Sequence, residues 1–142
     1  MTIENTVGSE MKKVKMVLRV LCIAAASSSC QAAWLEIGAN ETGTFYVDPP
    51  TIQRSGEIVK MWYLVDFKST QVDTNTKSFL SSKDQSEYDC KQERSRTLYY
   101  NNYSEKMGSG KIIFTLKDPL QWRPTGSGTI AAALLKIACS KK

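Results

Sequence analysis

The sequence has 142 residues, which is enough for one domain of ordinary size. Hydrophobic residues make up 42% of the chain and charged residues 23%, values that argue against a disordered, a collagen-like or a polytopic membrane protein. The absence of histidine excludes every catalytic triad or zinc site that needs imidazole. The formal net charge is +5 at pH 7, and it is unevenly distributed along the chain.

Residues 11–33 have the anatomy of a secretory signal peptide, in which a basic cluster leads into a short apolar run at 20–26. That run is far below the roughly 20 residues that span a bilayer, so we expect no transmembrane segment to be retained. We expect cleavage after Ala32 or Ala33. Residues 1–10 carry two acids and no apolar run, and we interpret them as a misassigned start or a non-native extension.

Cys30 suggests lipidation as an alternative fate of the leader. A bacterial lipobox has a leucine-like residue three positions before the cysteine, and Ser27 occupies that position, so we expect Cys30 to be removed with the leader. Removal of residues 1–33 leaves 15 basic and 12 acidic side chains, a net charge of +3. Because nucleic-acid binding needs a concentrated basic stripe, we expect no nucleic-acid partner.

Two cysteines remain after cleavage, Cys90 and Cys139. In an oxidising compartment such a pair predicts a structural disulfide. The spacing is not that of a redox CxxC motif, and a metal site would lack its other two ligands. A bridge would close a loop of about 50 residues and contribute about 4 kcal/mol to stability on the chain-entropy account. We expect neither a metal nor a cofactor.

Residues 34–142 are predicted to form a single domain that begins with strands. The expected strands lie, in chain order, at residues 34–37, 44–48, 58–67, 77–84, 88–100 and 111–116. The clearest of them alternates apolar residues with period two: Val59, Met61, Tyr63, Val65 and Phe67. Its opposite row mixes aromatic, apolar and charged residues, which indicates an antiparallel sheet with one packed face and one partly wet face.

Residues 69–76 are polar and rich in turn formers, which predicts a loop. The strand at 88–100 contains a conflict, because the row of Cys90 also carries Arg94 and Arg96. Either the guanidinium groups have acidic partners on the packed face, or a bulge or an edge position shifts the register. We favour the second explanation.

In the last segment the apolar residues recur with a helical period in place of the period of two that is typical of a strand. Residues 129–138 are helical by composition, and their apolar stripe comprises Ile130, Ala133, Leu134 and Ile137. Ser127 or Thr129 can cap the helix, which is too short to be stable unless it lies on the sheet. Cys139 would then attach it to the strand of Cys90. The predicted fold is α+β: a small antiparallel β-sheet of about five to six strands, a C-terminal helix packed on it, and one disulfide.

Gly110-Lys111 resembles the end of a phosphate-binding loop. Glu105 stands where such a loop needs glycine, and Ile112 stands where it needs Ser or Thr. We therefore interpret residues 107–110 as a hairpin turn.

The chain offers acid pairs, Asp84 with Glu87 and Glu87 with Asp89, but nothing distinguishes them from ordinary surface carboxylates. We expect no catalytic residue and no enzymatic activity. Aromatic and charged residues mingle after residue 83, which suggests a surface for protein contact. The candidate ligand-binding residues are Lys83, Lys91, Arg94, Arg96, Tyr99, Tyr100 and Tyr103.

An ordered set of short motifs spans nearly all of residues 34–142. It consists of Trp34, Tyr46-Val47-Asp48, residues 62–67, Ser81-Ser82-Lys83, Tyr88-Asp89-Cys90, Arg96, Tyr103-Ser104, Met107-Gly108, Trp122, Pro124 and a terminal helix ending at Cys139. This set resembles the bacterial surface-adhesin protein E family. The resemblance implies a small antiparallel sheet with a C-terminal helix and a disulfide. It also implies a surface lipoprotein adhesin that binds host matrix or plasma proteins such as vitronectin and laminin, and that can form a homodimer.

We therefore expect an exported, non-enzymatic binding domain at the cell surface or in the periplasm of a Gram-negative bacterium, with host extracellular-matrix or plasma proteins as partners. The alternative is a soluble periplasmic accessory or structural domain without a host ligand, because Cys30 lacks a convincing lipobox.

Overall fold

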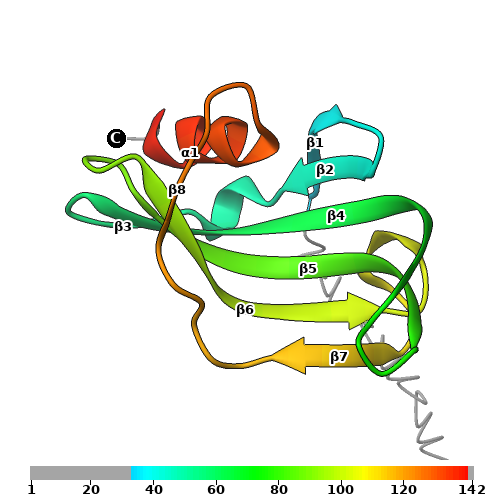
Figure 1. The fold of residues 1–142 in the computed structure, drawn as a ribbon. Coiled ribbons are helices and arrows are strands. Elements are labelled where there is room, and N and C mark those ends of the chain that lie inside the picture. Colours follow the sequence, from blue (N-terminus) through cyan, green and yellow to red (C-terminus); the bar gives the residue numbers. More distant parts are fainter. Residues whose placement is uncertain (1–32, 141–142) are drawn as a thin grey trace, which may run out of the picture. The chain divides into compact units, whose positions relative to one another are not determined.

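The computed structural model describes residues 33–140, so the predicted leader and Cys30 lie outside the described residues. Residues 33–140 form one antiparallel sheet and one α-helix, α1 (Ile130–Ser140) (Figure 1). Two short 3-10 helices, η1 (Pro49–Thr51) and η2 (Lys106–Gly108), lie in connections between strands. Within the same residues, no helix has the length and apolar character needed to cross a bilayer.

The sheet of the described domain has eight strands, more than the five to six expected. They are β1 (Leu35–Ala39), β2 (Gly43–Val47), β3 (Gln53–Ser55), β4 (Ile58–Val72), β5 (Ser78–Asp89), β6 (Arg94–Tyr103), β7 (Ile112–Leu116) and β8 (Arg123–Pro124). The strand order is β1-β2-β4-β5-β6-β7, with β3 paired to β4 and β8 paired to β6. The expected count was too low in part because β3 and β8 have three and two residues, too few to produce a periodic pattern.

The segment 88–100 contains a turn between two strands, so the prediction of one long strand is wrong. β5 ends at Asp89, whose Oδ1 accepts hydrogen bonds from the backbone N–H groups of Lys91 and Gln92 at 3.2 and 3.0 Å. This Asx-type turn reverses the chain, and Glu93 completes it with a φ of 48°. The turn contains neither glycine nor proline, so the sequence gives no ordinary sign of it.

The bulge favoured for this segment is confirmed. The pairing of β6 with β5 shifts at Leu98, which is the extra residue between Thr97 and Tyr99. The arginines of β6 do have acidic partners, but on the face away from the core, so the other explanation, which placed them on the packed face, is wrong.

The β4–β5 hairpin extends past the start of the loop expected at 69–76. β4 continues to Val72, and its pairing with β5 is interrupted between Asp66 and Gln71. The turn is held by Asp73, whose Oδ1 accepts backbone hydrogen bonds from two following residues at 2.9 and 2.8 Å. Backbone pairing needs no apolar side chain, which is why this polar stretch continues as a strand.

The core lies between α1 and one face of the sheet. Val59 and Met61 of β4 are fully buried there, as the alternating apolar row predicts, and Tyr88 of β5 lies beside them. Leu134 and Ala138 pack on these residues from α1. Burial of a large apolar side chain contributes about 1.5–3 kcal/mol, so this contact helps to hold the short helix in place.

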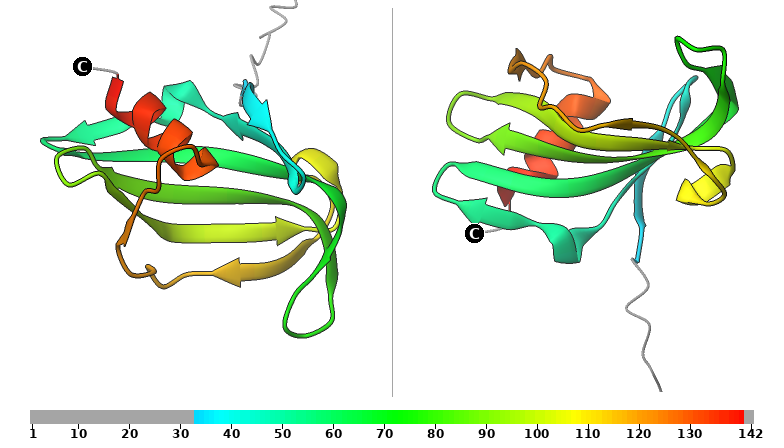
Figure 2. Two further views of the ribbon diagram at one scale, coloured as in Figure 1. Left: turned by 45° about the horizontal axis from the view of Figure 1, so that its top comes forward. Right: turned by 90° about the horizontal axis from the view of Figure 1, so that it is seen from below.

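α1 lies across the sheet near β3 and the β5–β6 turn (Figure 2). Its cap is Thr129, whose Oγ1 accepts a hydrogen bond from the Ala132 N–H at 3.2 Å. The Cys90–Cys139 disulfide joins the last turn of α1 to the residue that follows β5, with 5.7 Å between the two Cα atoms. The predicted bridge and the predicted helix on a sheet are both confirmed.

Candidate functional site

Strand alternation divides the side chains of the sheet between two faces. The face away from α1, which we call the open face, is not covered by any α-helix of residues 33–140. Its side chains on β4, β5 and β6 are largely aromatic and charged: Lys60, Trp62, Lys83, Gln85, Glu87, Asp89, Arg94, Arg96, Tyr99, Asn101 and Tyr103.

The structure brings five of the seven predicted ligand-binding residues together on this face: Lys83, Arg94, Arg96, Tyr99 and Tyr103. Tyr100 lies on the other face, where its ring packs against that of Phe114, with 5.6 Å between the ring centroids. Lys91 lies in the exposed turn between β5 and β6. Strand alternation thus separates neighbours that the sequence groups together.

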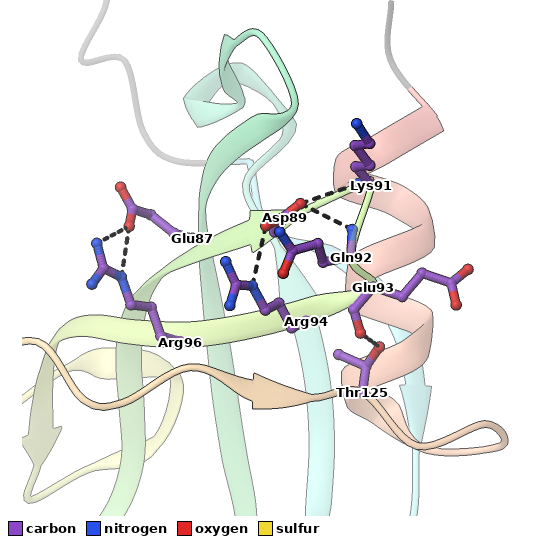
Figure 3. A network of polar contacts seen from close by, with 8 residues as sticks. All are labelled: Glu87, Asp89, Lys91, Gln92, Glu93, Arg94, Arg96 and Thr125. Carbon is purple, nitrogen blue, oxygen red and sulfur yellow. Dashed lines mark hydrogen bonds and ion pairs between the residues drawn. The ribbon is translucent and has the colours of Figure 1, made fainter.

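Asp89 organises the end of the open face next to the β5–β6 turn (Figure 3). Its Oδ1 accepts the backbone hydrogen bonds of Gln92 and Lys91, and its Oδ2 lies 3.1 Å from Nε of Arg94. The bond from the Gln92 N–H, assisted by Arg94, lowers the pKa of this carboxyl below its usual value. The carboxylate is therefore ionised, and its hydrogen bonds stabilise the turn.

Glu87, which lies two positions before Asp89 on β5, binds Arg96 of β6 (Figure 3). Its Oε2 lies 2.8 Å from Nε and 2.7 Å from Nη2 of the guanidinium group, and its Oε1 lies 3.6 Å from Nζ of Lys60. Contact through two guanidinium nitrogens fixes the orientation of the arginine as well as its position.

Trp122 lies over both arginines of this face. The Cζ atoms of Arg94 and Arg96 are 4.8 and 4.7 Å from the centre of its ring. Each such cation–π contact is worth about 0.5–2 kcal/mol. The two guanidinium groups therefore hold the segment around β8 against the sheet, and they present less free surface to a ligand than the sequence suggests.

A cavity of about 300 Å³ opens on the same face. It is lined by Trp34, Asp48, Thr51, Trp62, Lys83, Asn101 and Tyr103. A larger hollow of about 480 Å³ lies beside the disulfide, but no aromatic side chain from the described part of the chain lines it. Binding sites combine apolar walls with a few placed polar groups, so the aromatic cavity is the better candidate despite its smaller volume.

Ring contacts and hydrogen bonds hold the walls of this cavity. The ring of Trp62 meets that of Tyr99 edge to face, with 5.9 Å between centroids. The hydroxyl groups of Tyr99 and Thr115 both donate to Oδ1 of Asn101, at 3.1 and 2.5 Å. Because these side chains have their own partners, the shape of the cavity exists before a ligand arrives.

Lys83 is held in place at the cavity by Tyr103 and Gly108. Its Nζ lies 5.0 Å from the centre of the Tyr103 ring. Gly108 has a φ of 66°, and a Cβ at this position would overlap the Lys83 side chain. Glycine is thus required both by the backbone conformation and by the close approach of the lysine.

Asp48 contributes a carboxylate that has no partner within residues 33–140. The residue is 7% exposed, and its Oδ1 is buried without a hydrogen bond. It precedes η1 but does not cap it with its side chain. Its hydrogen bonds are made by the backbone: the N–H donates to the Trp62 carbonyl at 3.1 Å, and the carbonyl accepts from the N–H and the hydroxyl of Thr51 at 3.0 and 2.6 Å. An unsatisfied buried acceptor costs about 1–3 kcal/mol, so Asp48 does not serve stability.

Sequence reasoning missed Trp34, Asp48 and Trp62 as site residues. The first two are far in sequence from β5 and β6, and they reach the cavity because β2 pairs with β4 and β1 pairs with β2. Trp62 did carry a signal, since it is an aromatic residue on the row of its strand that faces away from the core.

The acid pairs considered for hydrolysis do not form facing carboxylates. Asp84 lies on the α1 side of the sheet, whereas Glu87 lies on the open face. Burial raises the pKa of Asp84 to about 7, against the effect of a hydrogen bond from the Ser82 hydroxyl at 2.6 Å. Glu87 and Asp89 share a face, but each is bound by its own arginine.

Comparison with known protein families gives a match over almost the whole described domain. Residues 34–140 match the family described as surface-adhesin protein E. The chain belongs to this family. The resemblance carried by the ordered motifs is therefore confirmed, whereas a search of the curated proteins finds no match.

The surface-adhesin protein E fold also appears in the solved structures similar to this chain. One structure of Haemophilus influenzae protein E is 17% identical, with a TM-score of 0.59 and coverage of 75% of this chain and 83% of that chain. The structure of its crystal form II is also 17% identical, with a TM-score of 0.61, and the match covers 75% of this chain and 87% of that chain. The structure of protein E from non-typeable Haemophilus influenzae is 18% identical, with a TM-score of 0.55, and the match covers 74% of this chain and 75% of that chain. At this identity the likeness establishes the fold and assigns no residue a role.

Proposed function

We propose that this protein is an exported, non-enzymatic binding domain that contacts other proteins through its open face. The observation that carries the proposal is the gathering of aromatic and charged side chains on the sheet face that α1 leaves uncovered. Aromatic residues and arginine are enriched at protein interfaces, and aromatic residues often dominate their binding energy. Membership of a family described as surface adhesins supports the same role.

The partners in this proposal are host extracellular-matrix or plasma proteins, met at the surface of a Gram-negative bacterium. The predicted signal peptide at 11–33 supports export. The competing function is that of a periplasmic accessory domain, and it makes a different prediction about location. A tag placed after Lys142 should be labelled on intact cells if the domain is an adhesin. Labelling only after permeabilisation would contradict the surface location.

Binding through the open face is tested by adding bulk at its centre. Gln85 lies on this face between Trp62 and Tyr99 in the register. In oxidised protein purified from cells expressing the whole chain, Gln85→Arg should weaken capture of a matrix or plasma protein about tenfold. Gln92→Arg, the same change in the exposed β5–β6 turn, is the matched control and should leave capture unchanged. Equal capture by both variants would remove the open face from the proposal.

A further inference from the structure

The cavity on the open face joins aromatic surfaces to an unpartnered negative charge. Trp34, Trp62 and Tyr103 supply the rings, and Asp48 supplies the carboxylate. We infer that this cavity binds an ammonium or guanidinium group, presented by a lysine or arginine side chain of a bound protein. The inference rests on the proposed function for the source of that side chain, whereas the chemistry of the cavity is argued from its own residues.

The rings and the carboxylate favour the same kind of ligand. Aromatic faces attract cations through their quadrupole, most strongly when water is excluded. A carboxylate forms its strongest hydrogen bonds with charged donors. An anion would be repelled by Asp48, and an apolar group would leave the charge of its carboxylate uncompensated.

Asp48 differs from three other acidic side chains of the open face. Asp66, Glu87 and Asp89 each have a basic partner, with N–O distances of 3.8, 2.7 and 3.1 Å. Within residues 33–140, Asp48 has no such partner. The chain thus neutralises these three carboxylates of the open face and leaves the one that lines the aromatic cavity to be neutralised from outside.

Among residues 33–140, Lys83 is the one basic side chain that lines the cavity, but it does not serve as the missing donor. Its stem passes under Gly108, and its ammonium group lies over the ring of Tyr103. It forms no ion pair with Asp48. The cation–π contact that it does form with Tyr103 is the kind of contact that the inferred ligand would make with the aromatic wall.

The volume of the cavity fits one side chain. Cavities that hold small molecules run from about 300 to 1,000 Å³, and this one, at about 300 Å³, is at the lower limit. An inserted lysine or arginine side chain would therefore act as a single anchor within a larger protein contact, in the manner of an interface hot spot.

The inference is tested first with two model ligands of matched shape. Nα-acetyl-lysine methylamide and Nα-acetyl-norleucine methylamide differ in the ammonium group at the end of the side chain, which only the lysine compound carries. Titration of oxidised whole chain, followed by NMR of the tryptophan indole N–H signals, should shift Trp34 and Trp62 with the lysine compound. The norleucine compound should bind at least about tenfold more weakly. Equal binding of the two compounds, or no shift with either, overturns the inference.

A variant then tests the carboxylate. Asp48→Asn should weaken binding of the lysine compound about tenfold while keeping or raising the melting temperature, because a buried charge without a partner is removed. Asp118→Asn, the same change on an exposed residue, is the control and should leave binding unchanged. Unchanged binding in Asp48→Asn overturns the inference.

Lys83→Gln distinguishes an external from an internal partner. Removal of this like charge should strengthen binding of the lysine compound. If Lys83 were instead the partner of Asp48, Lys83→Gln and Asp48→Asn would both lower the melting temperature to a similar extent, and the inference would fall.

The capture assay separates failure of the inference from failure of the proposed function. Capture that is sensitive to Gln85→Arg, without any binding of the lysine compound, overturns the inference and leaves the proposed function standing. Binding of the lysine compound without capture of any protein supports the cation site and contradicts the proposed function.

Discussion

Asp84 illustrates a residue whose local environment opposes its charge. It is 7% exposed on the α1 side of the sheet, and Ser82 is its hydrogen-bond donor. Burial raises its pKa to about 7 from an ordinary value of 3.8. Between these two values the native protein binds more protons than the unfolded chain, so the free energy of unfolding falls as the pH rises from about 4 to about 7.

Asp84→Asn should remove this dependence on pH. The variant should match the wild type near pH 4, where both native states are neutral at this position. At pH 8 it should be more stable by roughly 2–4 kcal/mol, because the ionised carboxylate is no longer buried. Urea unfolding at both pH values, with the disulfide intact, measures the difference. Asp118→Asn controls for the loss of one negative charge, and an equal effect of Asp84→Asn at both pH values would contradict the account.

α1 is an element that depends on its attachments. It has 11 residues, fewer than an isolated helix needs for stability in water. Leu134 and Ala138 attach it through the core, and the disulfide attaches it at Cys139. Nη2 of Arg54 also donates a hydrogen bond to the backbone carbonyl of Cys139 at 3.0 Å.

The double variant Cys90→Ser/Cys139→Ser should lose about 4 kcal/mol of stability, since the bridge closes a loop with a sequence separation of 49 residues. Thermal unfolding of the variant and of the wild type with and without reductant measures this loss. The reduced wild type should resemble the variant. An unchanged melting temperature after reduction would show that the core contacts alone hold α1.

The segment that precedes α1 is held by Trp122. The backbone N–H of Leu120 donates to the Thr97 carbonyl at 2.8 Å, and Trp122 stacks on the two arginines of β6. Trp122→Leu should remove the cation–π contacts and lower stability by about 1–2 kcal/mol. Hydrogen exchange at the backbone N–H of Leu120 should become faster, whereas exchange in β4 should change only with global stability. Unchanged exchange at Leu120 would mean that backbone pairing alone holds the segment.

The molecule uses the two faces of one sheet for different purposes. The face beneath α1 contains the apolar core, and the open face contains the ion pairs, the aromatic rings and the cavity. A sheet can separate these tasks because successive side chains of a strand point to opposite sides. Substitutions on one face should therefore leave the property of the other face intact.

Leu134→Ala and Asp48→Asn should show this separation. Leu134 is 4% exposed, so its truncation should cost about 2–5 kcal/mol while leaving the affinity for the lysine compound unchanged. Asp48→Asn should instead weaken binding of the lysine compound and leave the stability intact. Leu120→Ala, at a leucine that is 47% exposed, is the matched control and should change stability by less than about 0.5 kcal/mol. Loss of lysine binding in folded Leu134→Ala would contradict the separation of the two faces.

Local patterns in the sequence were sufficient for much of the fold. The alternating row of β4, the apolar stripe of α1 and the pairing of Cys90 with Cys139 are all present. Each of these features depends on periodicity or on a residue type that has one dominant behaviour in an exported protein. β3, β8 and the turn that divides 88–100 were not predictable, because their hydrogen bonds join short segments that have no pattern of their own.

The candidate site was predictable only in part. The sequence grouped Lys83, Tyr99 and Tyr103 because aromatic and charged residues mingle after residue 83, but the same pattern also included Tyr100, which strand alternation places on the other face. Trp34 and Asp48 join the cavity because β2 pairs with β4 and β1 pairs with β2. That order depends on hydrogen bonds between segments distant in the chain. Periodicity within a single strand therefore identifies a face of the sheet, and only the packed sheet assembles the site on it.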